Sequence, residues 1–217
     1  MYKTHAIKCQ AYAQRNANNF GDVVLMVSLS IQQNWLGVGD QLEDVRTNKL
    51  DSKFLWGSKA LAYKYIMTNK HTIFARMKAI MCSHLNDFEK SNSLMQVFLR
   101  IEGLGLVKAG FLCQLTCGFV GCMDVHNIKA YGIDPKILSY NKKLKTIKGQ
   151  AANKKKVEAY INLCHDYGTE KLWNAWCESL ALKSKKETLK KEHYCLQGLT
   201  VWKNYINGFQ CIMGVKE

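Results

Sequence analysis

The chain has 217 residues, and 31 lysine and arginine residues against 17 aspartate and glutamate residues give it a formal charge of +14. Hydrophobic residues make up 47% and charged residues 22%, a globular composition that excludes a mainly disordered chain. No apolar run approaches the about 18 residues that a membrane-spanning helix needs. The first residues, MYKTHAIKCQAYAQRN, lack the apolar core of a secretory signal, and nine cysteines are an odd number. We therefore expect an intracellular protein with reduced thiols and no membrane partner.

Apolar residues recur mostly with helical spacing, and no segment alternates with the period of a strand. Residues 22–31 form an apolar run that fits a buried helix or a strand, and Asn19 or Asp22 as N-cap favours the helix. The sequence predicts an all-α fold. Further helices are expected over residues 53–67, 72–84, 93–100, 107–117, 155–164 and 170–182.

A short turn, Gly103-Leu104-Gly105, separates two of these predicted helices. Two glycines permit a tight turn, and the N–H groups that begin the next helix lie at the positive end of its dipole, which suits a DNA phosphate. Lys108 adds a positive charge beside this turn. The pattern indicates a helix-hairpin-helix that grips DNA, or else a plain helical hairpin.

The segment IEGLGLVKA at residues 101–109, followed by an apolar helix and MDVH at residues 123–126, resembles the helix-hairpin-helix DNA glycosylase superfamily. That group includes endonuclease III, the adenine glycosylases and 8-oxoguanine glycosylase, in which L-P-G-V-G-x-K-x-A precedes V-D-x-H. The resemblance covers residues 93–127 well. It implies a barrel-like domain over residues 21–122, a second domain from residues 1–20 and 123–217, and a cleft between them.

The resemblance also implies roles for single residues. Asp124 matches the family's catalytic aspartate, whose carboxylate stabilises the cationic sugar or positions the attacking nucleophile. An aspartate there is also a common helix N-cap, and both roles can hold together. Gln32 and Gln33 follow a Leu-Ser-Ile segment similar to the family's L-S-x-Q helix end, whose glutamine enters the DNA near the displaced base. The alternative for them is a polar helix end, and His126 is expected to be structural.

The sequence departs from the family at several positions. Val107 occupies the place of the lysine that bifunctional members use as nucleophile, and Lys108 stands one residue later, on a different face of the helix. This predicts a monofunctional reaction rather than Schiff-base lyase chemistry. Ser28 stands where adenine-specific members have a glutamate, so adenine excision is not expected, and Glu102 replaces the proline before the turn.

Neither a metal nor a cofactor is expected. Late cysteines are too widely spaced for the family's iron–sulfur loop, and the central thiols lack a common zinc spacing, so we interpret the latter as core residues. The tryptophan pair and two phenylalanines are interpreted as core rather than as stacking platforms for bases. The late cysteines are Cys164, Cys177, Cys195 and Cys211. The central group consists of Cys113, Cys117, Cys122 and His126. The aromatic residues are Trp173, Trp176, Phe111 and Phe119.

Positive charge gathers in the second half of the chain. Residues 136–156 hold eight lysines and no acid, and a second cluster runs over residues 183–191. A lysine run forms either a solvated face or a set of phosphate contacts, and two runs in a chain of charge +14 favour phosphate contacts. Lys142 and Lys143 are accordingly candidates for DNA binding.

These observations predict a monomeric, monofunctional DNA glycosylase-like enzyme that flips a modified or damaged base out of double-stranded DNA and cleaves its N-glycosidic bond. One alternative is a viral thymine-hypermodification enzyme, acting in the host cytoplasm, in which an amine displaces pyrophosphate from an activated 5-hydroxymethyluracil in DNA. The richness in lysine, asparagine and tyrosine fits a viral source. The other alternative is a DNA-binding module without catalysis, in which the hairpin and the lysines only hold phosphates.

Overall fold

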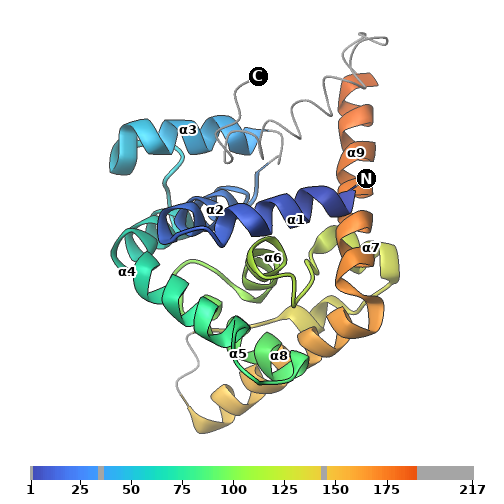
Figure 1. Ribbon diagram of the computed structural model, residues 1–217. Coiled ribbons are helices and arrows are strands. Elements are labelled where there is room, and N and C mark those ends of the chain that lie inside the picture. Colours follow the sequence, from blue (N-terminus) through green and yellow to red (C-terminus); the bar gives the residue numbers. More distant parts are fainter. Residues whose placement is uncertain (1, 34–36, 143–145, 190–217) are drawn as a thin grey trace.

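The computed structural model describes residues 2–33, 37–142 and 146–189, and these ranges contain helices but no strand (Figure 1). The predicted all-α fold is confirmed. The helices are α1 (Tyr2–Ala13), α2 (Ala17–Leu29), α3 (Val38–Asn48), α4 (Ser58–Met81), α5 (Asp87–Leu99), α6 (Leu106–Thr116), α7 (Val125–Tyr131), α8 (Ile147–Tyr167) and α9 (Thr169–Leu189), with short 3₁₀-helices η2 (Lys49–Asp51) and η3 (Pro135–Leu138).

Helix α6 lies at the centre of the molecule, where α1, α2 and α5 pack against it (Figure 1). Nine of its eleven residues are buried, because apolar and small side chains occupy all its faces rather than one stripe. Buried apolar residues of the described part form one connected core from Ala6 in α1 to Cys177 in α9. The division into residues 21–122 and the remainder stays a prediction.

Several helices differ from the sequence prediction: α1 and α3 were not predicted, and α5 and α8 begin earlier than expected. Helix α2 begins earlier than expected: its N-cap is Asn16, whose side chain accepts hydrogen bonds from the N–H groups of Asn18 and Asn19, so neither Asn19 nor Asp22 is the cap. The predicted helices over residues 53–67 and 72–84 are one helix, α4. The separation was wrong because residues 68–71 contain no glycine or proline and continue the helix without interruption.

The predicted helix-turn-helix is present. Helix α5 begins at a capping box in which Asn86 and Glu89 exchange side-chain and backbone hydrogen bonds. Gly103 has φ +79°, and an added Cβ would lie 2.0 Å from the carbonyl oxygen of Ser58 at the start of α4. Gly105 is the N-cap of α6 with an extended φ of −91°, and a Cβ there would meet nothing within 4 Å. The turn therefore packs against the N-terminus of α4, and only its first glycine is required by packing.

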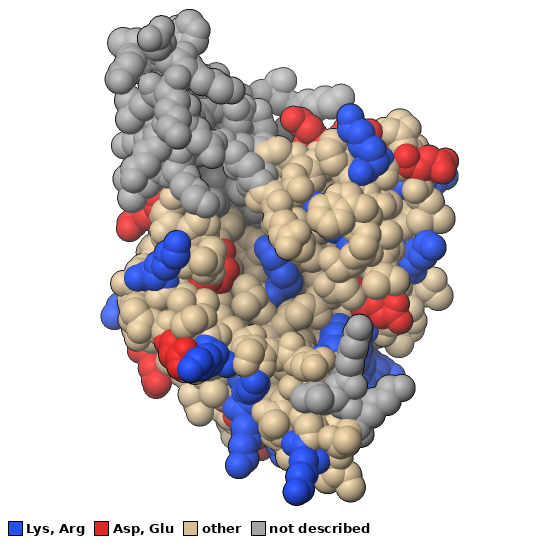
Figure 2. All heavy atoms as spheres, turned by 180° about the vertical axis from the view of Figure 1, so that it is seen from behind, with Lys and Arg blue, Asp and Glu red and all other residues tan. Residues whose placement is uncertain are grey.

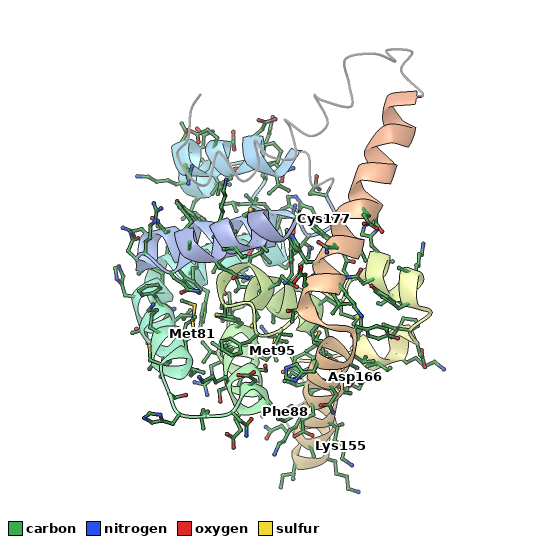
Figure 3. The ribbon with its side chains drawn as sticks, turned by 45° about the vertical axis from the view of Figure 1, so that its right-hand side comes forward. Met81, Phe88, Met95, Lys155, Asp166 and Cys177 are labelled. Carbon is green, nitrogen blue, oxygen red and sulfur yellow. The ribbon has the colours of Figure 1, made fainter. Side chains whose placement is uncertain are left out.

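Lysine and arginine side chains are spread over the face shown in Figure 2, with several gathered toward its lower end. The lysine run of residues 136–156 spans η3 and the first half of α8. Lys155 is exposed in the middle part of α8, whereas Met95 lies in the interior (Figure 3). None of the described helices combines the length and the apolar character needed to cross a membrane.

We expect Gly103→Ala to destabilise the fold by about 2 kcal/mol or more, because alanine pays for a left-handed φ and its Cβ meets the Ser58 carbonyl. The matched control is Gly105→Ala, which should cost less than about 1 kcal/mol because its backbone is extended and its surroundings are open. Urea unfolding of both variants measures the difference. Equal costs would contradict the tight contact between the turn and α4.

Candidate functional site

Asp124 is the N-cap of α7, as one of its two predicted roles requires. Its Oδ1 accepts hydrogen bonds from the backbone N–H groups of His126 at 2.9 Å and Asn127 at 3.4 Å. Its Oδ2 accepts a hydrogen bond from the indole Nε1–H of Trp176 at 2.9 Å. The carboxylate is half-buried and is oriented by three N–H donors, and an ionised carboxylate has further acceptor positions available for a ligand.

Buried polar side chains hold the chain that leads to Asp124. The Tyr160 hydroxyl donates to the Gly121 carbonyl and accepts from the Met123 N–H, each at 2.9 Å. The Asn127 amide donates to the carbonyls of Cys122 and Leu172. These bonds tie the loop before α7 to α8 and α9, so Asp124 has a fixed position.

Lys108 turns toward the interior rather than standing beside the turn as an exposed cation. Its Nζ donates to Ser30 Oγ at 2.8 Å and to the Ser30 carbonyl at 3.4 Å, and it lies 5.3 Å from the centre of the Phe111 ring. Burial lowers the pKa of Lys108, and the negative charge of Asp124 opposes part of that shift. Lys108 was expected on a different face from the family's nucleophilic lysine; its ammonium nevertheless lies within electrostatic range of Asp124.

A second lysine, Lys59 in the first turn of α4, lies close to this pair. It is only 1% exposed, and its Nζ has no hydrogen-bond partner in the described part of the chain and sits 4.7 Å from the centre of the Trp56 ring. Burial lowers the pKa of Lys59, and the positive charge of Lys108 lowers it further. The site therefore contains two neighbouring ammonium groups, of which only one is hydrogen-bonded.

The other predicted DNA-binding residues occupy different places in the structure. Lys142 donates from Nζ to the Ile101 carbonyl at 2.6 Å, which places it against the turn of the hairpin. Gln32 is exposed with φ +53°, two residues beyond Ser30, and Gln33 is exposed and accepts a hydrogen bond from Gln41 at 3.4 Å. Lys143 lies outside the described residues.

The tryptophans are core residues, as predicted, but one of them also serves the site. Trp173 is 1% and Trp176 is 3% exposed, and their rings stack with centroids 5.1 Å apart. The Trp176 ring also packs against Phe111, with ring centroids 4.9 Å apart, and its N–H donates a hydrogen bond to Asp124. Neither this hydrogen bond nor the burial of Lys59 was predicted from the sequence, because both arise where segments far apart in the chain come together.

The central thiols are packing groups. Cys113 and Cys122 are buried, Cys117 is half-buried, and burial raises the pKa of Cys9 and of Cys164 to about 12. Within the described ranges, no three His, Cys, Asp or Glu residues gather in a way that could hold a metal ion. Cys195 and Cys211 lie outside those ranges.

Comparisons with protein-family models, with curated proteins and with solved structures found no match.

We expect Lys59→Met to raise the free energy of unfolding at pH 7 by about 1 kcal/mol, because methionine fills the same space without an unpaired buried charge. Since the folded state lowers the pKa of Lys59, the charged amine costs stability at neutral pH, and this cost disappears as the pH rises toward the unfolded value of about 10.4. The gain should shrink accordingly. Denaturant unfolding at pH 7 and at pH 10 measures both effects.

Lys64→Met is the control for this experiment, since Lys64 is exposed on the same helix and its replacement should change stability by less than about 0.5 kcal/mol. A loss of stability in Lys59→Met would show that the Lys59 ammonium is well satisfied.

Proposed function

We propose that the protein is a DNA glycosylase-like enzyme, probing a flipped base at Asp124 and cleaving the bond between that base and its sugar. The observation that carries the proposal is the chain of contacts that links Lys108 to Asp124: Lys108 Nζ lies 5.3 Å from the centre of the Phe111 ring, Phe111 packs against Trp176, and Trp176 donates a hydrogen bond to Asp124. This cluster lies beside the helix-turn-helix of α5 and α6. Lys108 and Asp124 are 16 positions apart in sequence and come from different elements. The resemblance to helix-hairpin-helix glycosylases, which rests on residues 93–127, supports the same assignment.

The N-terminus of α6 supplies the proposed grip on the DNA backbone. No side chain caps α6 or α4, and the turn before α6 meets the first residue of α4 where Gly103 lies against the Ser58 carbonyl. Their positive dipole ends, together with Lys142 beside the turn, favour a phosphate at this point. Gly105 leaves open space in front of the turn, so a phosphate can approach the backbone closely.

In this proposal, the cleft lies between the domain of residues 21–122 and the second domain. Asp124 lies just after the domain boundary at residue 122. Lys108, from the first domain, acts electrostatically on Asp124, and Trp176, from the second domain, donates a hydrogen bond to it. Gln32 would enter the space left by the flipped base, because it lies just beyond the Ser30 group that holds Lys108.

The chemistry assigned to Asp124 is electrostatic. As the base departs, positive charge develops on the sugar, and a fixed carboxylate in a half-buried site stabilises that charge more strongly than water does. The same carboxylate can orient a water molecule toward C1′ of the sugar. Lys108 is bound to Ser30 and would act on the charge of the substrate rather than as the nucleophile, which keeps the reaction monofunctional.

Mass spectrometry of duplex oligonucleotides tests the proposal. The panel holds uracil, 5-hydroxymethyluracil, its pyrophosphorylated form with candidate amines, 8-oxoguanine and alkylated bases. We expect one substrate to lose the mass of its base, and Asp124→Asn to lower the rate by at least about 100-fold, since it removes the charge that stabilises the transition state.

Asp134→Asn is the matched control, because Asp134 caps η3 in the same way, accepting from the Lys136 N–H at 2.9 Å, but is exposed. It should retain full activity. A gain of mass on the activated pyrimidine would replace the glycosylase by the hypermodification enzyme, and binding without any mass change would replace it by a DNA-binding module.

The contribution of Lys142 is measured separately. Lys142→Gln should weaken DNA binding uniformly across sequences and reduce the slope of log affinity against log salt by about one, the amount expected for one lost phosphate contact. Fluorescence anisotropy at several salt concentrations gives this slope. Lys8→Gln, an exposed lysine on α1 outside both lysine clusters, is the control, and an equal effect in both variants would contradict a localised phosphate site.

A further inference from the structure

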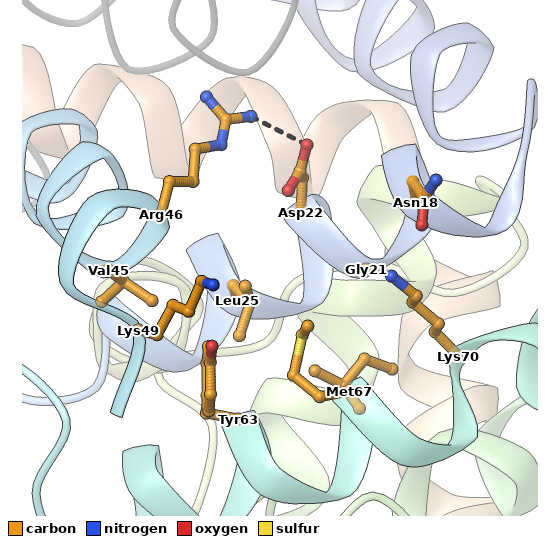
Figure 4. A pocket seen from close by; sticks show the side chains of 11 residues that line it. Asn18, Gly21, Asp22, Leu25, Val45, Arg46, Lys49, Tyr63, Met67 and Lys70 are labelled. Carbon is orange, nitrogen blue, oxygen red and sulfur yellow. Dashed lines mark hydrogen bonds and ion pairs between the residues drawn. The ribbon is translucent and has the colours of Figure 1, made fainter. Parts of the chain in front are cut away.

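A hollow of about 260 Å³ lies between α2, α3 and α4 (Figure 4). It shares no lining residue with the cluster around Asp124 and Lys108. Its floor is apolar, and its rim carries charged and polar side chains. The apolar part is made by Leu25, Val45, Ile66 and Met67, and the polar part includes Asp22, Arg46, Lys49, Tyr63 and Lys70.

The charges on this rim do not cancel. Asp22, the only carboxylate among the described residues that line the hollow, accepts a hydrogen bond from the Tyr12 hydroxyl at 2.9 Å and forms an ion pair with Arg46 at 2.8 Å. Lys49 and Lys70 form no ion pair in the described part of the chain, and their amino groups lie on opposite sides of the hollow (Figure 4). The walls therefore carry an excess of positive charge that one anion would neutralise.

Tyr63 supplies a hydrogen-bond donor to the hollow. Most of the side chain is buried, but its hydroxyl oxygen is not one of the buried polar atoms, so a ligand can reach it. Burial of the ring raises the pKa of Tyr63, so the hydroxyl keeps its proton and is a donor at neutral pH. In Figure 4 the hydroxyl points into the hollow, on the side of Lys49. A ligand oxygen in the hollow could therefore accept a hydrogen bond from it.

Gly21 keeps the hollow open. It lies inside α2, and glycine destabilises a helix relative to alanine. Its φ is nevertheless ordinary for a helix, and an added Cβ would meet only the flexible Lys70 side chain, at 3.5 Å. Packing of the helices therefore does not require a glycine here. The effect of the missing side chain is to leave free volume between α2 and α4.

We propose that this hollow binds a small organic anion, a carboxylate or phosphate carried on a short apolar body. The anionic group lies between Lys49 and Lys70 and accepts a hydrogen bond from Tyr63, and the apolar body lies on Leu25 and Met67. The volume of the hollow suits a metabolite rather than a polymer. The site works independently of any activity on DNA.

Isothermal titration calorimetry with three probes tests this inference: inorganic phosphate, hexanoate and hexyl phosphate. We expect one of the organic anions to bind more tightly than inorganic phosphate, and which one binds distinguishes a carboxylate site from a phosphate site. Tyr63→Phe and Lys49→Met should each weaken that binding about tenfold, the value of one hydrogen bond to a charged group. Lys64→Met, an exposed lysine next to Tyr63 on α4, should leave it unchanged.

Gly21→Ala separates a ligand site from a structural gap. It should raise the thermal midpoint of the free protein through its better helix propensity and weaken binding several-fold by filling the hollow. Binding that Gly21→Ala, Tyr63→Phe and Lys49→Met all leave unchanged would overturn the proposal. So would the absence of binding by every probe at millimolar concentration.

Discussion

The loop between α6 and α7 depends on a small set of buried hydrogen bonds, and the rest of the site depends on that loop. Tyr160 satisfies the backbone at Gly121 and Met123, and Gln114 Oε1 accepts from the Cys122 N–H at 3.0 Å. Tyr160 can approach only because Gly110 has no side chain: an added Cβ would lie 2.1 Å from its hydroxyl. Since unpaired backbone groups in a core are costly, these bonds hold the segment in one arrangement and set where Asp124 can stand.

The cluster around Asp124 departs from the rules that the surrounding core follows. Among the described residues, Lys59 is the one ammonium that is buried without a hydrogen bond; the other buried side-chain atoms without a partner are single oxygens of Gln41, Asn92 and Asn127. A buried charge costs more stability than a neutral oxygen, and such departures are typical of places where a fold serves a purpose other than its own packing. Lys59 stands next to Ser58, whose carbonyl meets Gly103 in the turn before α6.

Local signals explain what the sequence predicted and what it did not. The hairpin was predictable because Gly103 and Gly105 stand between two apolar periodic segments, and the cap at Asp124 was predictable because it precedes a helical pattern. The joining of α4 was missed, since two apolar stripes read as two helices although no breaker divides them. Lys59 carried no signal at all, because burial of one lysine is decided by how α4 packs against other elements and not by its neighbours in sequence.

The charges of Lys59, Lys108 and Asp124 favour a negatively charged ligand, whichever of the three functions the protein has. Two ammonium groups and one carboxylate leave a positive excess in a site that is largely out of water, where each unneutralised charge is costly. A neutral ligand would leave that cost in place, whereas a negatively charged ligand would reduce it, and the N–H groups that begin α6 offer a separate place for a phosphate. A glycosylase, a base-modifying transferase and a binding module would thus all hold the backbone in the same way. They differ only in what reaches the Asp124 carboxylate, which makes that one oxygen pair the point at which the three functions separate.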